Sequence, residues 1–206
     1  MPELLTVEED RMCQAWALDN PLRRTFVPAR RDLKALGLRP GQTVVDLGTG
    51  VGFLLPEILR DLGVGGRVLA VDIDEENLEV ARKRVASDPR VTFHVGSAAE
   101  RTPFPDGSAD RVLLSLVLCC LVDKSGALAE AWRLLRPGGL LLASYPRWGE
   151  GPRRSRRPLR VTPELWDRLV RERPWEELPR PRGRWVLRHL IRKPQRPIGA
   201  SEEEKK

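Results

Sequence analysis

The chain has 206 residues, 41% of them hydrophobic, and its 36 Lys and Arg residues against 29 Asp and Glu residues give a formal net charge of +7. This length suits one α/β domain, and this apolar fraction excludes a disordered or collagen-like chain. The longest apolar run covers only residues 112–122, whereas a membrane-spanning helix needs about 20 residues, so we expect no membrane span.

Short β-branched runs alternate with helical patterns between residues 28 and 145, which is typical of a parallel sheet covered by helices. The expected strands are 43–47, 67–72, 91–95, 109–118 and 140–145. The expected helices are 7–18, 28–36, one that opens at the glycine-rich segment 48–52 and runs to about 62, 75–86 with Asp74 as its N-cap, and one that follows Asp123 and runs to about 135. Residues 136–139, Arg-Pro-Gly-Gly, predict a turn.

The pattern changes after residue 145. Residues 146–160 have no periodicity and read as a loop rich in Arg, Pro and Gly. Thr162 and Pro163 then predict a helix that begins there and ends near Arg171, and residues 185–191 predict a last strand.

The strongest functional signal is the segment VVDLGTGVG at residues 44–52, where a strand ends and a helix is expected. Glycines at alternate positions, Gly48, Gly50 and Gly52, allow a tight turn and close approach of the backbone to a ligand. The amino end of a following helix would offer free N–H groups and a positive dipole. Dinucleotide dehydrogenases use a related turn, so the glycines alone do not identify the ligand.

Two carboxylates narrow the choice of ligand. Asp46 lies two residues before the first glycine, where it would repel a pyrophosphate and attract a cationic amino group. S-adenosylmethionine has an ammonium and a sulfonium and no phosphate. Asp72 ends the second expected strand and can accept hydrogen bonds from both ribose hydroxyls, which both ligand classes share. A nucleoside without phosphate is therefore favoured, and an NAD-dependent oxidoreductase is the less favoured alternative.

Four segments resemble, in order, the motifs of class I S-adenosylmethionine-dependent methyltransferases of the small ubiquinone/menaquinone-biosynthesis type: VVDLGTGVG, VLAVDIDEENLEVARKRV, VGSAAERTPFPDGSADRV and ALAEAWRLLRPGG. The resemblance implies an α/β, Rossmann-like fold, with a mostly parallel sheet, helices on both faces and an antiparallel last strand. It also implies a single methyltransferase domain, residues 1–193, with a cofactor-binding core at 28–145 and a basic acceptor-side segment at 146–193. Residues 194–206 are expected to form a disordered tail.

The resemblance implies S-adenosyl-L-methionine as the cofactor. The residues that it assigns to the cofactor are Asp46, Gly48, Thr49, Gly50, Gly52, Asp72, Ile73, Ser97, Ala98, Ser115 and Leu116. Asp72 would hold the ribose and Ile73 would pack on the adenine. Ser115 and Leu116 would lie beside the sulfonium and form the floor of the acceptor pocket. Ser97 departs from the family, which usually has Asp there, and would bind the adenine amino group more weakly.

The cysteine and histidine residues predict a reducing compartment and no metal ion. Cys119 and Cys120 are adjacent, and an odd total of three cysteines is typical of reduced thiols. No Cys and His residues have metal-ligand spacing.

Residues 1–14 are acidic and lack the basic start and apolar run of a signal peptide, so we predict a cytoplasmic protein.

The positive charge is concentrated near the carboxyl terminus. Residues 147–206 carry 18 basic and 9 acidic residues, whereas residues 1–146 carry 18 and 20. The Arg-rich stretch 153–160 lies among four tryptophans, Trp148, Trp166, Trp175 and Trp185. This combination is typical of single-strand nucleic-acid binding, but the neighbours of these tryptophans favour core packing.

The sequence therefore predicts an S-adenosylmethionine-dependent methyltransferase that acts on a small-molecule acceptor. An RNA or protein methyltransferase that uses the basic carboxyl-terminal segment is the alternative. A hydroxyl or ammonium acceptor requires a base to take its proton, and no residue in the sequence is marked as that base.

Overall fold

The computed structural model describes residues 29–146, 161–179, 181 and 186–195. Its strands are β1 (Thr43–Leu47), β2 (Arg67–Asp72), β3 (Val91–Val95), β4 (Ala109–Ser115), β5 (Leu135–Pro146), β6 (Glu176–Glu177) and β7 (Val186–Arg192). Its helices are α3 (Ala29–Leu36), α4 (Leu55–Leu62), α5 (Glu75–Arg84), α6 (Lys124–Leu134) and α7 (Pro163–Arg171). No helix in these ranges has the length and apolar character that a membrane span requires.

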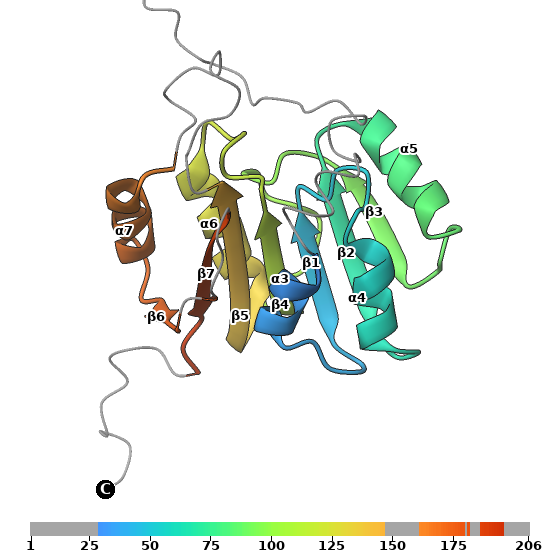
Figure 1. The fold of residues 1–206 in the computed structure, drawn as a ribbon, viewed down its shortest axis with the longest axis horizontal. Coiled ribbons are helices and arrows are strands. Elements are labelled where there is room, and N and C mark those ends of the chain that lie inside the picture. The colour runs from blue at the N-terminus through green and yellow to red at the C-terminus, as the bar shows by residue number, and fades with distance from the viewer. Residues whose placement is uncertain (1–28, 147–160, 180, 182–185, 196–206) are drawn as a thin grey trace, which may run out of the picture.

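The seven strands form one sheet in the order β3-β2-β1-β4-β5-β7-β6 (Figure 1). The first five strands in this order are parallel, and β7 runs antiparallel to both β5 and β6. The predicted α/β fold with a mostly parallel sheet and an antiparallel last strand is confirmed. The carboxyl ends of the parallel strands meet at one edge, the upper one in Figure 1. In open α/β sheets, ligands bind outside this edge.

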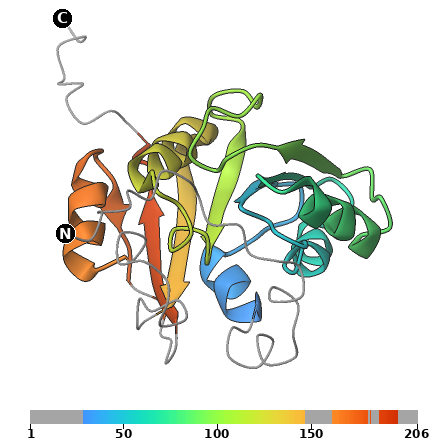
Figure 2. The same ribbon diagram turned by 90° about the horizontal axis from the view of Figure 1, so that it is seen from above.

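Helices cover both faces of the sheet because successive strand residues point to opposite sides. Val44, Leu113 and Leu142 pack with α3, α4 and α5 in one apolar core. Val45 and Leu114 pack with α6 and α7 in the other. Seen from above, α3 and α6 lie on opposite sides of the strands (Figure 2).

The carboxyl-terminal elements close the second core. Thr162 Oγ accepts a hydrogen bond from the Leu165 N–H at 3.2 Å, which confirms the predicted cap and the start of α7 at Pro163. Trp166 and Trp175 are buried, at 0% and 9% exposure, which confirms the prediction that these two tryptophans pack in the core. Trp148, Trp185, the expected helix 7–18 and most of the expected loop and tail lie outside the described residues.

Three predicted boundaries of helices and strands were wrong. In each case the backbone enters or leaves helical or strand geometry at a different residue from the one that the side-chain pattern indicates. Helix α4 begins at Leu55 rather than at the glycine turn, since all three glycines of segment 48–52 have positive φ and a right-handed helix does not. Strand β4 ends at Ser115 rather than 118, because Leu116 has a φ of 60°. Helix α5 ends at Arg84, two residues before the predicted end.

The start of β5 also differs from the prediction. The segment 136–139, expected as a turn, belongs to the strand, which begins at Leu135. The register shifts between Ala109 and Arg111 on the neighbouring strand, so this part of the strand is irregular rather than absent. Lys193 stabilises the junction, because its Nζ donates to the carbonyl of Trp132 in the last turn of α6 at 2.8 Å and to that of Leu135, the first residue of β5, at 2.7 Å.

Candidate functional site

The glycine turn lies at the carboxyl end of β1, packed closely against its neighbours. Gly48, Gly50 and Gly52 have φ values of 78°, 54° and 69°, the left-handed region that favours glycine. A Cβ at Gly48 would overlap Cγ2 of Val117, and one at Gly52 would lie 2.8 Å from Cβ of Ala81. Both the backbone angles and the lack of space therefore require glycine at these two positions.

Asp46 anchors the first half of the turn. It is only 2% exposed, and its Oδ2 accepts a hydrogen bond from Thr49 Oγ1 at 2.8 Å. The N–H groups of Gly48 and Thr49 both donate to the carbonyl of Val71 on β2 at 2.8 Å. The turn is thus fixed to the neighbouring strand, with a carboxylate held at its start.

Asp72 joins the glycine turn to the next helix. Its Oδ2 accepts a hydrogen bond from the Gly50 N–H at 2.7 Å, and its Oδ1 accepts one from the Asp74 N–H at 3.1 Å. Burial raises the pKa of Asp72 above its usual value, although the two backbone N–H groups oppose this shift. Sequence reasoning assigned Asp72 to the ribose and missed these two contacts, which no local pattern indicates.

The loop after β3 lies beside the end of β2. The Gly96 N–H donates to the carbonyl of Asp72 at 2.9 Å, and the two following residues, Ser97 and Ala98, are buried at 8% and 4% exposure. Ile73 is 45% exposed, an apolar side chain on which a flat ring can pack. The structure thus brings the predicted adenine-binding residues next to Asp72.

The end of β4 completes the group. Leu116 turns out of the strand, and its N–H donates to the carbonyl of Ser144 on β5 at 2.9 Å. The next residue, Val117, faces Gly48 of the glycine turn. Cys119 Sγ contacts the Leu116 carbonyl at 3.3 Å and lies 4.0 Å from Cys120 Sγ. All predicted site residues therefore lie in segments that meet at one edge of the sheet.

Sequence reasoning missed three buried polar residues beside Ser115. Asp32, Ser144 and Arg188 are 0%, 0% and 2% exposed, and Arg188 Nε donates to Asp32 Oδ1. Burial raises the pKa of Asp32, and the charge and hydrogen bond of Arg188 oppose this shift. One signal was present in the sequence: Asp32 lies four residues before Leu36 and next to Leu33, on the apolar face of its helix.

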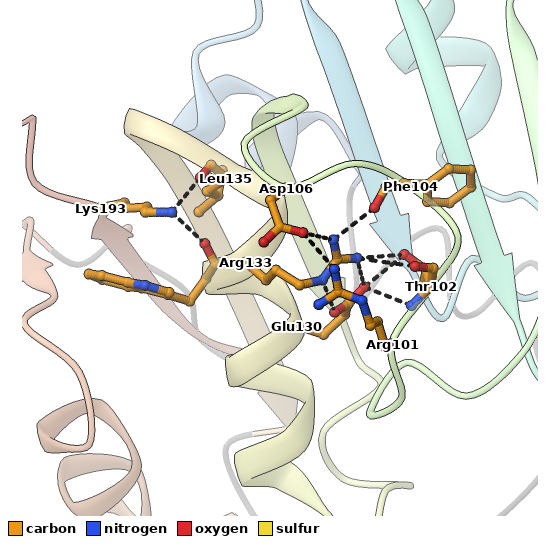
Figure 3. Close-up of polar contacts among 9 residues, drawn as sticks. Arg101, Thr102, Phe104, Asp106, Glu130, Arg133, Leu135 and Lys193 are labelled. Atoms are coloured by element: carbon orange, nitrogen blue, oxygen red, sulfur yellow. Dashed lines mark hydrogen bonds and ion pairs between the residues drawn. The ribbon is translucent and has the colours of Figure 1, made fainter.

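A clasp of polar residues also went unpredicted, and it fixes the loop of residues 96–108 to α6 (Figure 3). Glu130 Oε1 accepts hydrogen bonds from the N–H and hydroxyl of Thr102 at 2.9 and 2.7 Å. Arg133 donates to Glu130, Asp106 and the Phe104 carbonyl at 2.6 to 2.8 Å. Burial would raise the pKa of Glu130, but the hydrogen bonds from Arg133 and Thr102 hold it below its usual value. Because this loop carries Ser97 and Ala98, the clasp supports one side of the site.

Comparison with known proteins identifies the fold. Residues 45–143 match the family described as Methyltransferase domain. Over these residues the chain is similar to a methyltransferase domain. The crystal structure of a SAM dependent methyltransferase from Aquifex aeolicus superimposes with a TM-score of 0.72 at 25% identity, covering 85% of this chain and 95% of that one.

Two curated relatives are each 40% identical over part of this chain. An uncharacterized protein in a Streptomyces fradiae transposon matches over 116 residues, 56% of this chain and 33% of the relative. A ubiquinone/menaquinone biosynthesis C-methyltransferase of Vibrio campbellii matches over 108 residues, 52% of this chain and 42% of the relative. The chain thus spans less than half the length of these relatives.

The fold alone does not determine the reaction. The [4+2]-cyclase SpnF has a similar fold, with a TM-score of 0.68 at 17% identity over 81% of this chain and 80% of that one. Function therefore has to be argued from the site residues of the domain.

Proposed function

We propose that this protein transfers the methyl group of S-adenosylmethionine to a small-molecule acceptor. The observation that carries the proposal is the glycine turn, with the buried Asp46 at its start and Asp72 hydrogen-bonded to Gly50. The names of the Aquifex aeolicus and Vibrio campbellii proteins support the choice of cofactor and reaction.

The residues of the turn fit this cofactor. A carboxylate at the start of the turn attracts the ammonium of the methionine end and repels a diphosphate. Gly48 and Gly52 let the turn adopt positive φ angles and pack against Val117 and Ala81, which holds it in place. Asp72 accepts hydrogen bonds from two backbone N–H groups and from the side chain of Asn77. An ionised carboxylate has about four acceptor sites, so it can still accept a bond from a ribose hydroxyl.

The cofactor supplies a methyl group that the positive sulfur has already activated for displacement. The protein therefore has to orient two molecules and exclude water, and good orientation is worth up to about 7–11 kcal/mol. Ser97 and Ala98 would hold the adenine, Ile73 would pack on it, and Ser115 and Leu116 would face the acceptor.

Titration calorimetry with S-adenosylhomocysteine and NAD in parallel tests the cofactor assignment. We expect S-adenosylhomocysteine to bind and NAD not to bind. The variant Asp72→Ala should weaken binding at least tenfold, since a charged hydrogen bond contributes about 1.5–3 kcal/mol. The partly exposed Asp61 on α4, paired with Arg60, provides the control, Asp61→Ala, which should bind as the wild type does. Binding of NAD alone would refute the proposal.

A nucleic-acid partner has less support. The Arg-rich stretch 153–160 lies outside the described residues, and the two tryptophans of this region that the structure describes are buried. Salt-dependent retention on RNA, lost on neutralising Arg153 and Arg154, would favour the alternative. We propose a cytoplasmic location, because the chain has an odd total of three cysteines without the spacing of a disulfide framework.

A further inference from the structure

A row of polar side chains crosses three strands at the carboxyl edge of the sheet. Ser115 on β4 is in register with Ser144 on β5, which is in register with Arg188 on β7. Asp32 of α3 contacts both ends of this row, Ser115 and Arg188. The row before it on the same face is apolar throughout, and consists of Leu113, Leu142 and Leu190.

The position of the row ties it to the site. Asp46 is in register with Leu113, so the row lies one step closer to the carboxyl edge than Asp46 does. Leu116, the next residue of the chain, makes the turn that packs Val117 against Gly48. The polar row is therefore next to the part of the site where the acceptor is expected.

Only one member of the row is accessible. Asp32 and Ser144 are fully buried and Arg188 is 2% exposed, whereas Ser115 is partly exposed. A ligand that meets this row therefore meets the hydroxyl of Ser115, and the other three residues act through it.

The hydrogen bonds of the row fix the direction of that hydroxyl. Ser115 donates its single proton to Asp32 Oδ2 at 3.5 Å, and Ser144 Oγ lies 3.5 Å from Ser115 Oγ and also hydrogen-bonds Asp32. Arg188 donates to the other oxygen of Asp32. The guanidinium of Arg188 does not lose its proton. A neutral Asp32 would leave the charge of Arg188 buried and uncompensated. Asp32 is therefore ionised and can only accept hydrogen bonds. Ser115 thus meets a ligand with a lone pair of its oxygen rather than with its proton.

We propose that the methyl acceptor presents a hydrogen-bond donor, a hydroxyl or amino group, to Oγ of Ser115, and that Asp32 and Arg188 are positioning residues that fix the orientation of this oxygen. The inference rests on the proposed function and specifies the acceptor class. The stability of the fold does not explain why Asp32 and Arg188 form a buried ion pair, because replacing such a pair by apolar residues is often neutral or stabilising. A fixed lone pair at the acceptor side does explain it.

The test uses the full chain saturated with S-adenosylhomocysteine and two matched probes. Catechol carries hydroxyl donors, and 1,2-dimethoxybenzene has the same ring without them. We expect catechol to bind the wild type about three- to tenfold more tightly, the effect of one net hydrogen bond. In Ser115→Ala this ratio should fall to about one. The control Ser125→Ala, which removes an exposed hydroxyl on α6 that contacts Glu172, should keep the ratio.

The variant Asp32→Asn, combined with Arg188→Met, tests the positioning role. The amide that this substitution introduces can donate to Ser115 and release the proton of its hydroxyl, so we expect the ratio to fall while the affinity for S-adenosylhomocysteine stays within twofold. Should this double variant not fold, Ser115→Ala decides the matter alone.

The outcomes separate the inference from the proposed function. No binding of S-adenosylhomocysteine would refute the proposed function. With that ligand bound, equal affinity for the two probes, including no binding of either, would overturn the inference. So would a ratio that survives Ser115→Ala, or a loss of S-adenosylhomocysteine affinity in that variant as large as the loss for catechol.

Discussion

Replacing Gly48 with Ala should destabilise the protein more than an equivalent change at a glycine with free space. Gly48 and Gly41 have nearly the same φ, 78° and 80°. A Cβ at Gly41 has nothing within 4 Å, whereas one at Gly48 would overlap Cγ2 of Val117 and approach its Cβ at 2.8 Å. The two substitutions therefore share the backbone cost and differ in the steric cost.

The expected magnitudes follow from these two terms. A left-handed conformation costs a residue with a Cβ about 1–2 kcal/mol, and this is the whole expected effect of Gly41→Ala. Overpacking adds about 1–3 kcal/mol, so Gly48→Ala should lower the free energy of unfolding by about 2–5 kcal/mol. Adding Val117→Ala to Gly48→Ala removes the overlapping Cγ2 methyl group, although Cβ of this residue stays 2.8 Å away. The double change should therefore recover about 1 kcal/mol relative to the sum of the single changes.

Equilibrium unfolding in urea measures these differences, and calorimetry with S-adenosylhomocysteine shows whether the turn still binds. We expect Gly48→Ala to lose binding and Gly41→Ala to keep it, because only the first displaces the turn. Equal destabilisation by the two substitutions, or normal binding by Gly48→Ala, would refute the reasoning that the turn is packed against the segment that follows β4.

Three further predictions concern the supports of the site. Glu130→Gln should lower the free energy of unfolding in urea by about 1.5–3 kcal/mol, since it removes the more buried of the two carboxylates that pair with Arg133 and leaves Asp106 as the other; an effect below about 1 kcal/mol would contradict the clasp. The pKa of Glu130 is held below its usual value, so its stabilisation is present above the unfolded pKa of about 4.3 and is lost as the pH falls through the folded value. Urea unfolding between pH 6 and 3 should therefore show a steeper loss for the wild type than for Glu130→Gln, and parallel curves would contradict this. Thr162→Ala removes the cap of α7 and should cost about 1 kcal/mol in thermal unfolding, whereas Thr162→Ser should cost little.

Much of the fold follows from local sequence pattern. The bounds of β1, β2 and β3 agree with prediction because each is a short β-branched run between turn residues. The start of α7 was predictable because Thr162 and Pro163 act within one turn of each other. The end of β4 was not, because the apolar run continues past Ser115 and only the backbone angle of Leu116 ends the strand.

The site was likewise predictable where its residues occur in local motifs. The glycine turn and Asp72 occur in motifs, and the structure brings their segments together at one edge. The pair of Asp32 and Arg188 joins residues 156 positions apart, and no local signal links two such positions. The contacts of the predicted residues with the cofactor stay predictions.

The central claim is that the carboxylate of Asp46 recognises the cationic end of the cofactor. Calorimetry of the wild type and Asp46→Asn with two ligands tests it: S-adenosylhomocysteine, which has an ammonium, and 5′-methylthioadenosine, which has the same nucleoside and no amino-acid end. A charged hydrogen bond of about 1.5–3 kcal/mol predicts that the substitution weakens S-adenosylhomocysteine binding about 10- to 100-fold and leaves that of 5′-methylthioadenosine unchanged. Unchanged affinity for S-adenosylhomocysteine, or an equal loss for both ligands, would contradict the claim.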